Sequence, residues 1–171
     1  MCSMNKEIRI TKIESARRQL ESAVILYFND KDPISIHTLV CAAHEIIAKL
    51  NRKQGGAALI MEGSMIKKEY QNEFRREIRK AKNFFKHADS DPDESLVFNP
   101  DNNDYYLLDA CEGYELLTGE KNSYFVIYRG WFISKYPHIL NTVSGQLIRN
   151  KFINDKLKYF TNMIEASVQL Q

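Results

Sequence analysis

The chain has 171 residues, which suits one domain, because domains typically span roughly 100–200 residues. Apolar residues make up 44% and charged residues 27%, a composition that is typical of a globular protein and excludes wholesale disorder. The 24 lysines and arginines nearly balance the 22 aspartates and glutamates. Any binding of nucleic acid must therefore come from local clusters of cations rather than from overall charge.

Cysteine usage and hydropathy indicate the compartment. The three cysteines, Cys2, Cys41 and Cys111, are odd in number and far apart, which argues against a disulfide framework and favours a reducing environment. No segment approaches the ~20 apolar residues that a membrane-spanning helix needs, and the first residues lack the apolar core of a secretion signal. We expect a cytoplasmic protein of bacterial type that does not bind a membrane.

Apolar residues at helical spacing predict helices over residues 12–28 and 33–50. The first begins at a capping-box pattern, Thr11 with Glu14, in which each residue hydrogen-bonds the backbone of the other. The second begins at Pro33, because proline suits the first helical position.

Further along, the clearest pattern predicts a long helix over 65–88, followed by a connection at 89–104 that contains two prolines. Helices are then expected over 104–117 and 123–136, and the segment 138–171 is expected to form one broken helix or two short ones. Nowhere do apolar and polar residues alternate as in a strand. The predicted fold class is all-α, a single-domain helical bundle of about six helices that covers the whole chain.

The helix at 65–88 carries the most distinctive charge pattern. Between residues 75 and 86 it holds six basic residues, Arg75, Arg76, Arg79, Lys80, Lys82 and Lys86. Helical geometry places Arg76, Lys80, Asn83 and His87 on one flank, away from the apolar stripe. Such a ridge can bind phosphate through charge, with the amide and the imidazole supplying specific hydrogen bonds. The alternative is a solvated basic face whose His87 caps the helix or pairs with Asp89.

The connection at 89–104 is acidic and has no lysine or arginine. Its Asp89-Ser90-Asp91-Pro92-Asp93 segment begins like a calcium loop, but Glu94 and Pro100 occupy the positions that need glycine and a bidentate glutamate. We therefore expect this connection to fold over the basic helix, or to cap a neighbouring helix, through complementary charge.

Two other groups of side chains are candidates. His37, Cys41 and His44 share one face of a helix, which allows a metal site completed by Asp109, Glu112 or Glu115, or equally a packed apolar face. The second group is the aromatic cluster of the fifth helix, which is expected to form core or a dimer face: Tyr124, Phe125, Tyr128, Trp131, Phe132 and Tyr136. No sequence element calls for a cofactor.

The segment 81–89, Ala-Lys-Asn-Phe-Phe-Lys-His-Ala-Asp, late in a long helix of an all-α bundle, resembles the motif region of HEPN-type domains. Most of the chain is also similar to small bacterial proteins that carry Ser-Ile-His-Thr-Leu, here 35–39, and Asn-Phe-Phe-Lys-His-Ala-Asp, here 83–89. HEPN ribonucleases cleave RNA without a metal, with two copies facing one RNA backbone. The resemblance implies catalytic roles for His87, Asn83 and Lys82, although Lys82 stands where that family has arginine and cannot grip phosphate with two parallel hydrogen bonds.

Three functions follow as expectations. The first is an HEPN-like homodimer that binds RNA or a nucleotide through Arg76, Arg79, Lys80 and Lys86, with metal-independent RNA cleavage as an added activity. The second is a non-enzymatic dimeric interaction or regulatory module whose aromatic fifth helix forms the interface. The third is a helical bundle that binds a metal through His37, Cys41 and His44.

Overall fold

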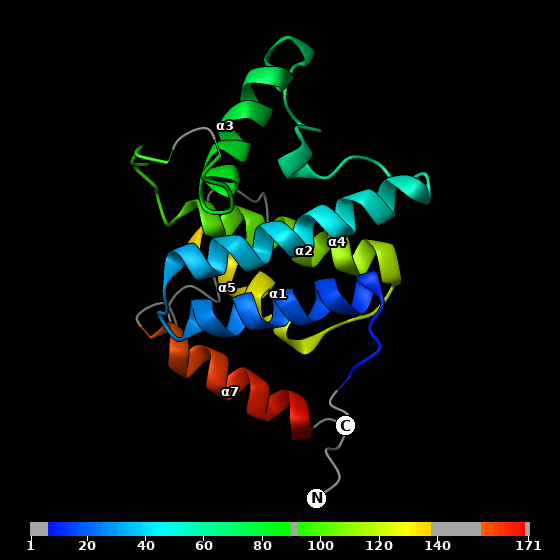
Figure 1. Cartoon of the computed structure of the whole chain (residues 1–171). Helices are drawn as coiled ribbons and strands as arrows, with labels where there is room; N and C mark the ends of the chain where they lie inside the picture. Colours follow the sequence, from blue (N-terminus) through cyan, green and yellow to red (C-terminus); the bar gives the residue numbers. More distant parts are fainter. Residues whose placement is uncertain (1–6, 90–91, 138–154, 170–171) are drawn as a thin grey trace, which may run out of the picture.

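A computed structural model describes residues 7–89, 92–137 and 155–169, and these ranges form an all-α structure with no strand (Figure 1). The fold class predicted from the sequence is therefore confirmed. The helical elements are α1 (Lys12–Phe28), α2 (Pro33–Lys53), the 3₁₀ helices η1 (Ile60–Glu62) and η2 (Lys68–Tyr70), α3 (Gln71–Phe84), α4 (Asn102–Thr118), α5 (Ser123–Lys135) and α7 (Lys156–Gln169).

The first two helices begin where local sequence predicts. At the start of α1 the Glu14 amide donates to the Thr11 hydroxyl at 3.3 Å and the Thr11 amide donates to the Glu14 carboxylate at 2.8 Å, which confirms the capping box. At the start of α2 the Asp32 carboxylate accepts from the Ser35 amide at 2.8 Å. The end of α2 lies at Lys53 rather than residue 50, because its backbone hydrogen bonds continue to Gln54.

Helices α1, α2, α4 and α5 pack around one apolar core, and α7 covers α1 and α5 on the side away from α3 (Figure 1). The aromatic residues of α5 point into this core, where the Trp131 ring meets Phe28 with ring centroids 5.9 Å apart. Only 5% of Trp131 is exposed. Four residues of the cluster are thus core, as one of the two interpretations expected, and two are half-buried. The core residues are Phe125, Tyr128, Trp131 and Phe132, and the half-buried ones are Tyr124 and Tyr136.

The largest departure from the predicted elements is α3, which spans Gln71–Phe84 instead of 65–88 and has no buried residue. Gly63 adopts a left-handed conformation (φ 88°) and η2 intervenes, so the chain turns before it enters the helix. In Figure 1, α3 rises away from the layer that α2 and α4 form. The apolar stripe of Phe74 and Ile78, expected in the core, is only half-buried.

The connection between α3 and α4 docks through an aromatic residue and, near its end, through charge. The Phe98 ring lies 4.9 Å from the His37 ring and 5.2 Å from the Phe85 ring, between centroids. None of its described carboxylates pairs with a lysine or arginine of α3, so the expected folding of this acidic segment over the basic helix was wrong there. The alternative, complementary charge with a neighbouring helix, is present, because Asp101 and Asp104 pair with Lys135 of α5 at 3.6 and 2.6 Å. Residues 138–154, where part of the last predicted helix falls, lie outside the described residues.

Candidate nucleic-acid interface

Contacts along one side attach α3, and the residue that follows it, to the bundle. The Tyr106 hydroxyl of α4 donates to the Ile78 carbonyl at 3.1 Å, and the Arg75 guanidinium donates to the Glu62 carbonyl at 3.1 Å. Just after the helix, the Phe85 ring packs edge-on against His37 with centroids 5.7 Å apart. These anchors fix which side of α3 faces the protein.

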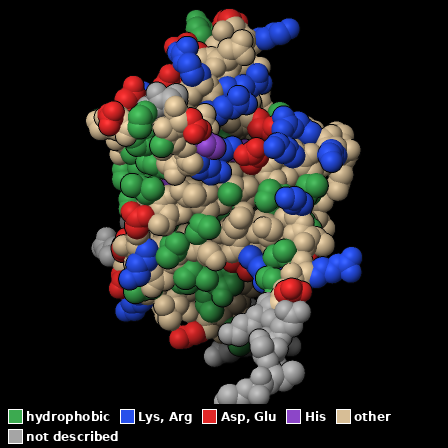
Figure 2. Space-filling view, viewed as in Figure 1, with side chains coloured by type: hydrophobic (Ala, Val, Ile, Leu, Met, Phe, Trp, Pro, Cys, Tyr) green, Lys and Arg blue, Asp and Glu red, His purple; other side chains and the backbone are tan. Residues whose placement is uncertain are grey.

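We call the outer face of α3 the exposed surface that carries Arg79 and Lys80 and, just beyond the end of the helix, Lys86. Among the residues that the structure describes, no carboxylate forms an ion pair with any of the three. Figure 2 shows lysine and arginine side chains gathered over this end of the molecule. Since a cation without a carboxylate partner keeps its full charge for a ligand, these three are better suited to an anion than the paired cations Arg76 and Lys82.

Lys82, which the resemblance places at the phosphate, is already occupied. Its ammonium hydrogen-bonds the Glu45 carboxylate of α2, and only 21% of the Lys82 side chain is exposed. Glu45 also accepts from Lys49 at 2.7 Å. Hydrogen bonds from Lys49 and Lys82 lower the pKa of Glu45 to about 2, so this carboxylate stays ionised and neutralises Lys82 at physiological pH.

Arg76 is also paired, although it is exposed. Its guanidinium lies 3.3 Å from the Glu77 carboxylate and 4.0 Å from the Glu73 carboxylate. Exposed pairs of this kind are weak and exchange readily with solvent, so Arg76 can still turn to an incoming phosphate. Because of these pairs, Arg76 offers less free charge to an anion than the three cations without a carboxylate partner.

Asn83 and His87 are both exposed, as the ridge requires. The helix ends at Phe84, so His87 lies beyond the last turn instead of within it, although its amide still donates to the Asn83 carbonyl at 3.0 Å. The His87 imidazole lies 3.9 Å from the Asp89 carboxylate, and both side chains are mostly exposed. Thus the alternative pairing with Asp89 is present, but as a loose contact that leaves the imidazole open to solvent.

The face of α2 that carries His37, Cys41 and His44 is a packed layer between α2 and α4. His37 Nδ1 lies 2.8 Å from the Asn103 amide oxygen, and His44 Nε2 lies 2.8 Å from the Asp109 carboxylate. Within the described ranges, no three His, Cys, Asp or Glu side chains come together as metal ligands. The packed-face interpretation therefore fits the structure, and the proposed ligand set does not form.

One detail of this layer would suit nucleophilic catalysis if it were accessible. The Cys41 sulfur lies 3.4 Å from Nε2 of His37, and Nδ1 of the same ring faces Asn103. A thiol, an imidazole and an amide therefore form one chain of contacts. Burial, however, raises the pKa of the Cys41 thiol to about 12 and lowers the pKa of His37. All three residues are buried, and the thiol stays protonated. We assign these residues to the core.

Asp109, which the sequence offered as a metal ligand, caps a backbone turn instead. Besides accepting from His44, its carboxylate accepts the amides of Ile60 and Met61 at 3.0 and 2.9 Å. These amides begin η1, the first element on the path to α3. Sequence reasoning missed this role, because no local signal connects residue 109 with a turn far away along the chain.

Comparison of the chain with protein-family models, with curated proteins and with solved structures finds no match. In the described ranges, no helix is both long enough and apolar enough to cross a membrane. The function must therefore be argued from the arrangement of the side chains.

Proposed function

We propose that this protein binds single-stranded RNA, or a nucleotide, through phosphate contacts with the outer face of α3. The observation that carries the proposal is the group formed by Arg79, Lys80 and Lys86, exposed and without a carboxylate partner among the described residues. Lysine and arginine bind phosphate mainly through charge, which gives affinity with little dependence on sequence. Asn83 and His87 lie beside these cations and supply hydrogen bonds that charge alone does not.

The HEPN-like character inferred from residues 81–89 supports the same surface. Two of the three motif positions, Asn83 and His87, are exposed, and the third, Lys82, is held by Glu45. Because Glu45 neutralises the cation of the motif, the motif is better suited to bind RNA than to stabilise a transition state strongly. We therefore place phosphate binding first and cleavage second.

The proposal is tested by measuring RNA binding over a range of salt concentrations. Replacing Arg79, Lys80 and Lys86 together with glutamine should weaken binding of a single-stranded RNA. It should also make the slope of log K against log salt shallower by about 2, because each lost phosphate contact accounts for about 0.7. Fluorescence anisotropy with a labelled oligonucleotide measures both quantities.

A matched control removes the same charge elsewhere. Lys12, Lys121 and Lys158 are exposed and lie on α1, on the connection before α5 and on α7. Their triple glutamine variant should retain the affinity and the salt slope of the original protein. Absence of salt-dependent binding by the original protein, or equal losses in the two variants, would overturn the proposal.

Cleavage of the bound RNA is the second candidate, favoured by the joint exposure of Asn83 and His87. An imidazole that is open to solvent can transfer protons to and from a ribose hydroxyl and a leaving oxygen. The His87→Ala variant should then lose cleavage while it keeps most of its affinity for RNA. Cleavage that survives this substitution, with chelator present, would assign the activity to other residues or to a contaminant.

The homodimer that the resemblance implies is the remaining part of the proposal. Met65 is 78% exposed and Tyr70 is 56% exposed, which supplies apolar surface on the segment that leads into α3. Analytical ultracentrifugation with and without RNA measures the state of association. A protein that binds RNA as a monomer would contradict the dimer and leave the phosphate-binding face intact.

A further inference from the structure

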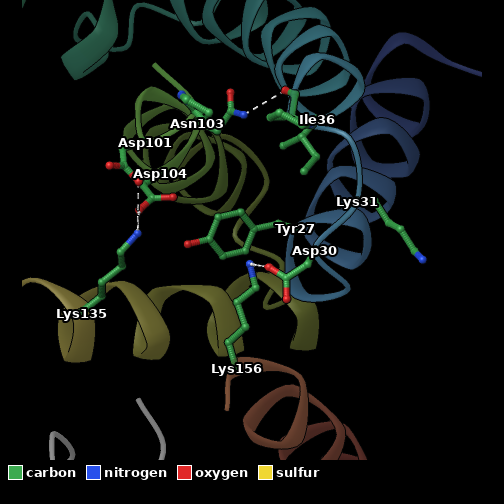
Figure 3. Close-up of a pocket in the computed structure, with 11 residues that line it drawn as sticks. Tyr27, Asp30, Lys31, Ile36, Asp101, Asn103, Asp104, Lys135 and Lys156 are labelled. Carbon is green, nitrogen blue, oxygen red and sulfur yellow. Dashed lines mark hydrogen bonds and ion pairs between the residues drawn. The ribbon is translucent and has the colours of Figure 1, made fainter. Parts of the chain in front are cut away.

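A cavity of about 260 Å³ lies at the end of the bundle where α1 and α5 finish and where α2, α4 and α7 begin (Figure 3). It is separate from the outer face of α3. Its wall combines an aromatic hydroxyl with charges of both signs. The residues used below are Tyr27, Asp30, Asp101, Asp104, Lys135 and Lys156.

The deepest charge in the wall is Asp104, of which only 1% is exposed. One oxygen of its carboxylate accepts from the Lys135 ammonium at 2.6 Å and from the Tyr136 hydroxyl at 2.7 Å. Burial acts to lower the pKa of Lys135, but the hydrogen bond to Asp104, the charge of Asp104 and the contacts with Tyr27 and Tyr136 together outweigh it, and the pKa rises. The pair of Lys135 and Asp104 therefore keeps an ammonium at the wall. Such pairs are weak evidence for stability, so a binding role deserves consideration.

Tyr27 and Lys156 form the opposite part of the wall. The Tyr27 hydroxyl accepts from the Trp131 indole at 3.3 Å and points toward Lys135 and Asp104 in Figure 3. Burial, followed by the charge of Asp104, raises the pKa of Tyr27, so the hydroxyl remains a neutral donor. The Lys156 ammonium lies 4.2 Å from the centre of the Tyr27 ring and 2.6 Å from the Asp30 carboxylate.

Depth separates the net charge of the wall. The side chains of Lys135 and Lys156 are 33% and 21% exposed, whereas those of Asp101 and Asp30 are 70% and 78% exposed. The two lysines outnumber the one buried carboxylate, Asp104, so the inner wall has a net positive charge that suits an anionic group. The two carboxylates of the rim suit a cationic group. An ammonium has three N–H donors, so Lys156 keeps donors beyond the one that Asp30 uses, while Lys135 is shared between Asp104 and Asp101.

We propose that this cavity binds a free amino acid, with its carboxylate held inside by Lys135, Lys156 and Tyr27 and its ammonium at the rim near Asp30 and Asp101. A zwitterion adds no net charge to a wall in which charges are already paired, whereas a simple anion or cation would leave one charge unbalanced. The volume admits a small metabolite rather than a polymer. This ligand class does not depend on whether α3 binds RNA.

Isothermal titration calorimetry of the full chain with each proteinogenic amino acid tests the proposal. At least one should bind, while its N-acetyl derivative, which lacks the ammonium, and its amide, which lacks the carboxylate, should bind at least about tenfold more weakly. Inorganic phosphate serves as the probe for a plain anion site. If no amino acid binds, or if phosphate or the N-acetyl derivative binds as tightly, the proposal is overturned.

Two substitutions connect binding with this cavity. Lys156→Gln removes a donor of the inner wall, and Lys158→Gln is its matched control, because Lys158 is exposed on the same helix and does not line the cavity. The first should weaken the amino acid about tenfold and the second should not. Tyr27→Phe, which removes one oxygen and keeps the ring in the core, should also weaken binding. If Lys156→Gln and Tyr27→Phe bind the amino acid as tightly as the original protein does, and their circular dichroism is unchanged, the ligand binds elsewhere.

Discussion

At the scale of single residues, burial decides which chemically capable side chains can act. Cys41 has a histidine 3.4 Å from its sulfur, yet it is 2% exposed, and Cys111 is completely buried. His87 has no comparable network among the described residues, yet its imidazole is open to solvent. Access therefore matters more here than a reactive arrangement, so His87 and not Cys41 is the candidate for proton transfer.

The first prediction concerns Cys41. Because burial raises the pKa of its thiol to about 12, almost none of it is thiolate at neutral pH, and reagents that attack thiolates should not modify it in the folded protein. Alkylation followed by peptide mass spectrometry should find Cys41 unmodified until denaturant is added. Modification of Cys41 in the native protein at the rate of a small-molecule thiol would show that this layer opens.

At the scale of helices, the link between α2 and α3 governs how many cations α3 can offer. Glu45 of α2 binds Lys82 and thereby withdraws one positive charge from the outer surface. The Glu45→Gln variant should release Lys82 and make the salt slope of RNA binding steeper by about 0.7. Glu165→Gln, which removes one exposed carboxylate from α7, is the control and should leave the slope unchanged. A steeper slope in both variants would indicate a general effect of net charge.

The same link has a defined dependence on pH. The pKa of Glu45 is about 2 in the folded protein and 4.5 in the reference state, so the contact stabilises the fold fully at neutral pH. Its contribution should fade as the pH falls below about 4.5 and toward 2, where the carboxylate takes up a proton. The stabilities of the original protein and of Glu45→Gln, measured by acid unfolding with circular dichroism, should therefore converge at low pH. A difference in stability between the two proteins that grows as the pH falls would contradict this.

At the scale of the whole molecule, a well-packed bundle carries a helix that contributes little to its core. Helices α1, α2, α4 and α5 share buried side chains, whereas α3 has none and is attached by a few contacts along one side. Helices with few buried contacts open locally without unfolding of the rest. A binding surface on such a helix can adjust to its ligand at low cost.

Hydrogen exchange measures this difference directly. Backbone amides of α3 should exchange at least about tenfold faster than those in the middle of α2, because their opening does not require disruption of the core. Bound RNA should slow the exchange of α3 selectively. Equal protection of α3 and α2 in the free protein would show that α3 is part of the same cooperative unit.

Local sequence determined the fold class and most helix boundaries. The Thr11–Glu14 capping box, Pro33 at the start of α2 and Gly119 in a left-handed conformation after α4 all act within a few residues of the boundary they set. Interactions over so short a range can be recognised in a sequence without knowledge of the tertiary structure. The basic character of α3 was predictable for the same reason.

Only the tertiary structure decided which residues remain available for function. Three features depend on partners that lie far apart in the chain. Glu45 pairs with Lys82, Asp109 caps the start of η1, and the ends of five helices enclose one cavity. The apolar stripe of α3 has the spacing of a core helix, yet the turn at Gly63 directs it away from the bundle. Periodicity reports that a helix has an apolar face, but packing between distant segments determines whether that face is buried.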